Sequence, residues 1–205
     1  MQFLNKIISF LDIPVMYRLF FRLIGADVFR KVFATEYVMA QPSDRVLDIG
    51  CGPGDILNYL PAVNYTGFDI SEKYIDAAKR RFGLRARFFC GDVANTMLEE
   101  ENGTFDVVLA TGVLHHLDDE RAAKLLALAA HALKPRGSFF SYDGCFILEQ
   151  TKLERWVLAH DRGKYIRPKD EFVRLARRHF TTVETYIRHD LVLVPYTTLI
   201  MRCAR

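Results

Sequence analysis

The 205-residue sequence predicts an α/β fold with a doubly wound, mostly parallel sheet. Three observations lead to this prediction. Short β-rich runs alternate with helical patterns from Ser43 onward. The continuous apolar run 105–111 is typical of a strand buried on both faces. A glycine-rich turn follows the first predicted strand, at the edge where such sheets bind ligands.

Composition limits the classes of protein that remain. Half of the residues are hydrophobic and 26% are charged, which is a globular balance and excludes a largely disordered chain. Lys and Arg number 28 against 25 Asp and Glu, and this formal net charge of +3 is low for a nucleic-acid binder. The four cysteines form no CxxC pair, so neither structural zinc nor a disulfide framework is expected.

The predicted elements follow the chain in order. Ser71 is a predicted N-cap, and Pro135 with Gly137 should end the longest helix. The last two strands should form an antiparallel pair joined by a short turn. Strands are expected at 45–50, 65–69, 86–90, 105–111, 138–142, 182–189 and 192–201, and helices at 55–60, 71–82, 118–134 and 169–179.

Residues 1–40 are predicted to form a helical lid or substrate-contacting segment, and residues 41–205 the ligand-binding domain, within one compact unit. The first 25 residues are apolar, but Asp12, Pro14, Arg18 and Arg22 interrupt them, so a membrane span is not expected. No signal-peptide cleavage site follows, and a cytoplasmic location is expected. An amphipathic helix here could pack on the domain, cover a site or lie on a membrane surface.

The loop Asp48-Ile-Gly-Cys-Gly-Pro-Gly-Asp55 is the most informative stretch. Its glycines allow a sharp turn and a close approach of ligand to backbone. Asp69 ends the next predicted strand, 19 residues after Gly50, which is the spacing of an acid that accepts hydrogen bonds from ribose hydroxyls. A nucleoside ligand is therefore expected at this edge of the sheet.

Aspartate stands at position 55, where the dinucleotide pattern requires glycine, and its charge would repel a pyrophosphate. Pro53 removes a backbone donor from the loop, and Asp48 adds a second acid before it. These residues favour a phosphate-free, positively charged ligand such as S-adenosylmethionine (SAM). An NAD-dependent oxidoreductase is the alternative from another class.

Several segments together resemble the class I SAM-dependent methyltransferases of the small-molecule type. VLDIGCGPGDIL (46–57) resembles the glycine motif, GFDIS (67–71) the ribose-acid motif and CGDV (90–93) the adenine motif. FDVVLATGVLHHLDD (105–119) and LKPRGSFF (133–140) resemble the segments of the fourth and fifth strands. The resemblance implies a Rossmann-like, seven-stranded sheet with an antiparallel C-terminal strand pair.

The resemblance also implies a cofactor site. The backbone near Gly50 and Thr111 would hold the methionine portion, Asp69 the ribose, and Ile70 and Asp92 the adenine. No metal is expected. The predicted cofactor-binding residues are Asp48, Gly50, Cys51, Gly52, Asp69, Ile70, Gly91, Asp92, Val93 and Thr111.

His116 is the predicted general base, since histidine titrates near neutral pH and a hydroxyl acceptor must lose a proton. Tyr17 and Asp143 are predicted to face or orient the acceptor. Packing or a turn is the alternative role for each of the three residues.

The predicted function is methyl transfer from SAM to a small molecule, with a hydroxyl acceptor favoured and S-adenosylhomocysteine as product. A nucleic-acid or lipid-like acceptor is the alternative. Residues 110–113 read ATGV and lack the Asn/Asp-Pro-Pro-Tyr-like tetrad of amino-base methyltransferases, so nucleic acid is disfavoured. A non-catalytic SAM-binding module also remains open.

Overall fold

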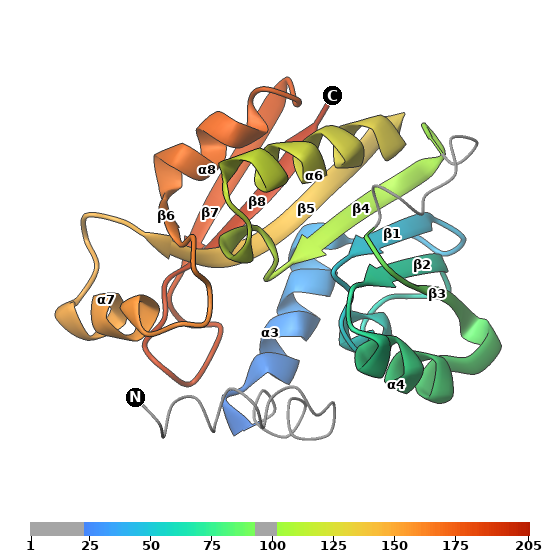
Figure 1. The fold of residues 1–205 in the computed structure, drawn as a ribbon, viewed down its shortest axis with the longest axis horizontal. Helices are drawn as coiled ribbons and strands as arrows, with labels where there is room; N and C mark the ends of the chain where they lie inside the picture. The colour runs from blue at the N-terminus through green and yellow to red at the C-terminus, as the bar shows by residue number, and fades with distance from the viewer. Residues whose placement is uncertain (1–22, 93–101) are drawn as a thin grey trace.

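The computed structural model describes residues 23–92 and 102–205, and its centre is a sheet with the order β3-β2-β1-β4-β5-β8-β7 (Figure 1). β8 is antiparallel to both neighbours, and the other pairs in this order are parallel. The predicted doubly wound, mostly parallel sheet is confirmed. Its strands are β1 (Arg45–Ile49), β2 (Asn64–Asp69), β3 (Ala86–Cys90), β4 (Phe105–Thr111), β5 (Leu133–Phe146), β7 (Thr182–Arg188) and β8 (Thr198–Ala204), and the two-residue β6 (Arg167–Pro168) also pairs with β5.

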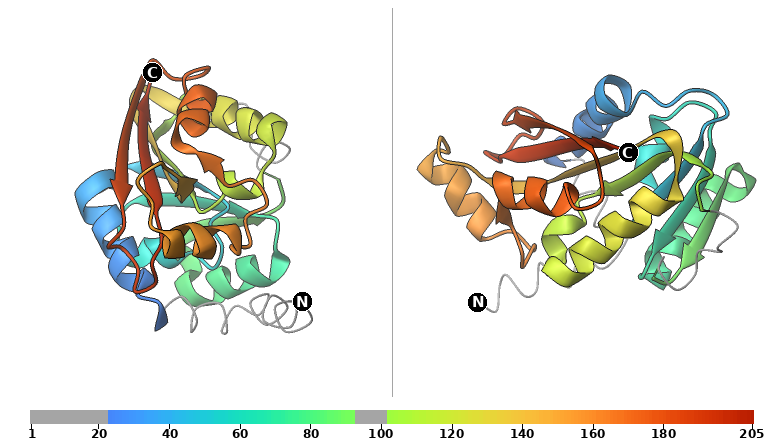
Figure 2. Two further views of the ribbon diagram at one scale, coloured as in Figure 1. Left: turned by 90° about the vertical axis from the view of Figure 1, so that its left-hand side faces the viewer. Right: turned by 90° about the horizontal axis from the view of Figure 1, so that it is seen from above.

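Helices cover both faces of this sheet. α6 (Asp119–Ala132) and α8 (Lys169–Ala176) pack on one face, while α3 (Ala26–Val32) and α4 (Glu72–Phe82) pack on the other. Seen from above in Figure 2, α3 and α6 lie on opposite sides of the sheet. Successive residues of β4 serve the two faces, because Val107 points into one core cluster and Val108 into the other. This alternation explains the continuous apolar run.

Side-chain caps begin three of the helices. Ser71 accepts a hydrogen bond from Tyr74 N at α4, as predicted, and Asp118 accepts one from Arg121 N at α6. α7 (Lys152–Ala159) begins with a capping box between Thr151 and Glu154. Each cap satisfies a backbone N–H that the helix leaves unpaired.

The predicted boundary between α6 and β5 was wrong. The helix ends at Ala132 and the strand begins at Leu133, so Pro135 lies inside the strand. Leu133 pairs with Phe105, and Lys134 Nζ donates hydrogen bonds to both carboxylate oxygens of Asp106 at 2.7 and 2.8 Å. The pairing shifts register between Phe105 and Val107, which accommodates the proline.

The short turn predicted between the last strands was also wrong. Residues 189–197 connect β7 to β8, which starts at Thr198. Part of the apolar run assigned to the strand instead packs beside the N-terminal helix. Val192 packs against the cluster that contains Phe29, and Leu193 N donates to Ile24 O at 2.8 Å.

The described part of the predicted N-terminal segment belongs to the core. Phe29 in α3 and Phe33 in the following π-helical turn (Phe33–Val38) contact the ring of Tyr142, with centroids 4.3 and 5.0 Å apart. Tyr17 and Val93 lie outside the described residues. Among the helices that the structure describes, we find none with the length and apolar character needed to span a bilayer.

Candidate active site

The glycine loop after β1 is fixed against the end of β2. Gly50 N and Cys51 N both donate to Phe68 O, at 2.8 and 2.9 Å. Gly50 has a φ of +74°, and a Cβ at this position would stand 2.5 Å from Val113 Cγ2. Both the backbone conformation and the space therefore require glycine here.

Asp69 is locked by two backbone donors. Its Oδ2 accepts from Gly52 N at 2.9 Å and its Oδ1 from Ser71 N at 2.8 Å. Burial raises the pKa of Asp69, and these two hydrogen bonds oppose that rise. Ile70 follows with 82% of its surface exposed, beside Gly91, whose N–H donates to Asp69 O. Asp69, which is predicted to bind ribose, therefore contacts the glycine loop through its carboxylate and Gly91 through its backbone carbonyl.

A small cleft opens beside the loop. It brings together the predicted Gly50, Cys51, Gly52 and Thr111. Its other lining residues are Arg30 from α3, Pro53, Asp55, Ile56 and Tyr142.

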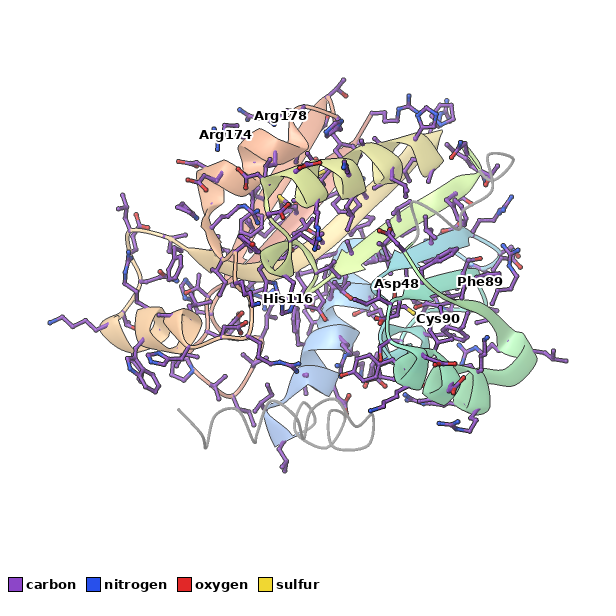
Figure 3. The ribbon with its side chains drawn as sticks, in the orientation of Figure 1. Asp48, Phe89, Cys90, His116, Arg174 and Arg178 are labelled. Atoms are coloured by element: carbon purple, nitrogen blue, oxygen red, sulfur yellow. The ribbon has the colours of Figure 1, made fainter. Side chains whose placement is uncertain are left out.

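Asp48 lies within the sheet, close to the glycine loop but outside the set of residues that line the cleft (Figure 3). It is fully buried, and Tyr65 Oη donates a hydrogen bond of 2.5 Å to its Oδ2. Burial raises the pKa of Asp48 to about 7, although the Tyr65 hydrogen bond lowers it. Its Oδ1 has no hydrogen-bond partner among the described residues.

The charge argument from Asp55 needs a correction. The carboxylate is buried between two cations, with a hydrogen-bonded ion pair to Arg81 and with Arg30 Nη2 3.7 Å from its Oδ2. These guanidinium groups compensate the negative charge that was expected to repel a pyrophosphate. The side-chain volume at position 55 and the missing donor at Pro53 remain as arguments against a dinucleotide.

The structure pairs Asp143 with His115, whereas sequence reasoning chose His116. Asp143 Oδ1 accepts from His115 N at 3.1 Å and lies 2.8 Å from His115 Nδ1. Asp161 Oδ1 lies 3.8 Å from His115 Nε2. A Cβ on Gly112 would lie 3.8 Å from His115 Cε1 and 3.7 Å from the Tyr142 ring, which places both rings next to the cleft residue Thr111.

The pKa values of the two adjacent histidines are shifted in opposite directions. Burial lowers the pKa of His115, but the hydrogen bond and charge of Asp143, with the charge of Asp161, outweigh it, so that pKa is raised. Partial desolvation lowers the pKa of His116 to about 4, and charge on His115 adds to the effect. At neutral pH His116, labelled in Figure 3, is therefore an uncharged, exposed imidazole.

Arg167 holds the segment after β5 against the 3₁₀ turn Leu114–His116 through hydrogen bonds. Its guanidinium donates to Leu114 O at 3.0 Å, to Leu117 O at 2.6 Å and to Asp119 Oδ1 at 2.9 Å. The side chain is only 5% exposed. Tyr165 N also donates to His115 O at 2.9 Å. The 3₁₀ turn that carries both histidines is therefore held by a distant part of the chain.

Sequence reasoning did not single out Arg30 or Asp161, and it preferred His116 to His115. Arg30 is in an ordinary amphipathic pattern, and Asp161 lies in a stretch without clear periodicity. The clustering of polar residues at the strand ends was the available signal for His115. Among the described residues, no group of three or more His, Cys, Asp or Glu side chains is placed to hold a metal ion.

Comparison with known proteins agrees with this arrangement. Residues 46–137, which include the glycine loop, Asp69 and both histidines, match the family model described as a methyltransferase domain. Residues 46–137 therefore form a SAM-dependent methyltransferase domain. The methyltransferase fold extends beyond the matched residues, since β5, β7 and β8 complete the same sheet.

Two curated relatives show how widely the acceptors of similar methyltransferases vary. The malonyl-[acyl-carrier protein] O-methyltransferase of Bacillus anthracis is 33% identical over 39% of this chain and 30% of its own length. The mRNA cap guanine-N(7) methyltransferase 1 of Arabidopsis thaliana is 31% identical over 49% of this chain and 33% of its own length. The chain thus spans about a third of the length of each of these two relatives.

A solved structure covers nearly the whole methyltransferase chain. The TehB-like SAM-dependent methyltransferase of Corynebacterium glutamicum superposes with a TM-score of 0.66, covering 94% of this chain and 97% of its own. The sequence identity is 22%, so the likeness establishes the fold.

Proposed function

We propose that this protein transfers the methyl group of SAM to the hydroxyl of a small molecule and releases S-adenosylhomocysteine. One observation carries the proposal: Gly52 and Thr111 both line the cleft, Gly52 N donates to Asp69, and Thr111 comes just before the turn that holds the His115–Asp143 pair. A carboxylate suited to ribose and a candidate proton acceptor therefore lie next to residues that line one cleft.

The residues at the cleft fit SAM. Asp69 offers carboxylate lone pairs to ribose hydroxyls, and the exposed Ile70 offers an apolar surface to an adenine ring. Arg30 lines the cleft beside Asp55 and offers a guanidinium to the carboxylate of SAM. SAM carries an activated methyl group on a sulfonium, together with an ammonium, a carboxylate and an adenosine.

The protein's own contribution would be positioning and proton removal. In the tautomer that carries its proton on Nδ1, His115 donates a hydrogen bond to Asp143, and Nε2 is the basic nitrogen of the neutral ring. Nε2 can then accept the proton of an acceptor hydroxyl as the oxygen becomes nucleophilic. Burial of this pair and the rings of Phe29, Phe33 and Tyr142 keep water from one side of the site.

His116 remains the second candidate for the base, because it is exposed and uncharged at neutral pH. It would be a weaker base than His115, since its pKa is lowered to about 4. Variants of each histidine distinguish the two roles.

The experiment is turnover of SAM to S-adenosylhomocysteine with a panel of hydroxyl, carboxyl, amine and lipid-like acceptors. Methylation of a hydroxyl compound supports the proposal, and Asp69→Ala provides the inactive control. Cofactor binding without turnover on any acceptor would favour a SAM-binding module. Binding of NAD in preference to SAM would favour an oxidoreductase.

A further inference from the structure

α7 presents an apolar outer face that packing does not explain. Its inner face is anchored, since Leu158 is 1% exposed and Glu154 is 7% exposed. On the outer face Leu153 is 55% and Trp156 60% exposed, and Leu148, just before the helix, is 96% exposed. Figure 1 shows α7 projecting at one end of the molecule, beyond the edge of the sheet. We call Leu148, Leu153 and Trp156 the α7 apolar face.

The orientation of this face is fixed. Glu154 Oε2 accepts from Thr151 N at 2.9 Å and from Thr151 Oγ1 at 2.8 Å, and its Oε1 pairs with His189 from the β7–β8 connection. The helix therefore cannot rotate to bury Leu153 and Trp156 without breaking a buried carboxylate network. The Trp156 ring contacts the His160 ring, with centroids 4.4 Å apart, on the same outer surface.

Positive charge surrounds the α7 apolar face. Between residues 148 and 165 the exposed ionic side chains are four cations and one carboxylate, Glu149. The Arg155 guanidinium lies over the Phe146 ring, 5.3 Å from its centroid, so part of this charge is held in place. The exposed cations are Lys152, Arg155, Arg162 and Lys164.

We propose that the α7 apolar face docks on an anionic phospholipid bilayer. Trp and Leu flanked by Lys and Arg on a surface helix are typical of segments that lie in the membrane interface. The exposed side chains stand on a helix that projects from the body of the molecule (Figure 1). A bilayer needs no complementary groove, so this shape favours lipid over a protein partner. The proposal does not depend on the methyl-transfer reaction.

Trp156 is the single tryptophan of the chain, so its emission reports on α7 directly. The full chain is mixed with vesicles of phosphatidylglycerol and phosphatidylcholine, or of phosphatidylcholine alone. The expected result is a blue shift of Trp156 emission and co-sedimentation with the anionic vesicles, both weakened by salt. The Arg155→Glu variant should bind about tenfold or more weakly, because a cation is replaced by an anion. Leu153→Ser should also weaken binding.

Matched controls are Leu84→Ser and Arg80→Glu, which change an exposed leucine and an exposed arginine near α4. Both should bind vesicles like the parent chain. Co-sedimentation without a shift in Trp156 emission would place the membrane contact elsewhere and overturn the proposal. Equal binding to neutral vesicles, or no binding, would also overturn it. A blue shift that grows with protein concentration without vesicles would identify self-association through α7 instead.

Discussion

Gly163 lies against the ring of His115 so closely that a Cβ at position 163 would stand 2.1 Å from His115 Cδ2 and 3.0 Å from His115 O. The segment between α7 and β6 therefore fixes the ring on one side, while Asp143 fixes it on the other through Nδ1. The position of the candidate base thus depends on a residue outside the glycine loop and outside β4.

Gly163→Ala should displace the His115 ring and lower turnover, by about tenfold to a hundredfold, with little change in SAM affinity. A misplacement of about 1 Å is enough for such a loss. Steady-state kinetics and calorimetry with SAM provide the two measurements. Gly163, unlike Gly52 and Gly83, does not have a positive φ, so this substitution tests the contact with His115 and not left-handed backbone strain. Unchanged turnover in Gly163→Ala would argue against His115 as the base.

The pH dependence of turnover should follow His115. Because its pKa is raised, the neutral ring needed for proton acceptance is lost as pH falls below that raised value, and the rate should fall with it. Asp143→Asn removes the charge that raises the pKa, so the acid limb should move to lower pH while kcat falls about a hundredfold or more. A pH–rate profile of parent and variant checks both effects. If His116→Ala moves the limb and His115→Ala does not, the base is His116.

Asp69→Ala should weaken SAM binding by about tenfold to a hundredfold, since hydrogen bonds to a charged group are worth about 1.5–3 kcal/mol. The substitution also releases Gly52 N and Ser71 N, so Asp69→Asn is the milder companion. Isothermal calorimetry measures the affinity, and thermal unfolding without SAM separates it from damage to the loop. Unaltered affinity in Asp69→Ala would remove the ribose assignment.

Glu154 should make the anchoring of α7 sensitive to acid. Burial raises the pKa of Glu154, but hydrogen bonds from Thr151 and the pair with His189 lower it to about 2. Because the folded pKa lies below the ordinary value of 4.5, the carboxylate stabilises the fold above pH 4.5, and this contribution is lost as pH falls toward 2. Glu154→Gln should lose about 1–2 kcal/mol at pH 7 and show less acid sensitivity.

Urea unfolding at pH 7 and pH 3 measures this contribution. Glu149→Gln, an exposed carboxylate near α7, is the matched control and should leave both midpoints close to those of the parent. An equal pH dependence in Glu154→Gln and the parent would contradict the assignment.

Local patterns predicted most of the sheet and little of the long-range pairing. The strands at 45–49, 86–90 and 105–111, the Ser71 cap and the position of Asp69 follow from alternation, capping and spacing within short windows. The end of α6 could not be predicted from Pro135, because the strand begins with the pairing of Leu133 to Phe105, which lies far back in the sequence.

The contacts of the candidate site were also not predictable from local sequence patterns. Asp55 looked like an uncompensated acid, but Arg81 reaches it from α4 and Arg30 from α3. His115 and His116 are equivalent in the sequence, and only the folded sheet shows which of them Asp143 meets. The charge balance of Asp55 and the partner of Asp143 both depend on residues that the fold brings together from distant parts of the sequence. Helical and strand periodicities within short windows carry no information about such contacts.

Arg167 connects the part of the chain that matches the methyltransferase domain family with a part that lies outside the match. Arg167 lies beyond the residues that match this family, but its guanidinium donates hydrogen bonds to Leu114 O and Leu117 O within them. Gly163 and Arg167 both hold the histidine turn, so the residues between β5 and position 160 can change in length and composition without releasing it. Variation in that part of the chain is thereby uncoupled from the position of the His115 ring.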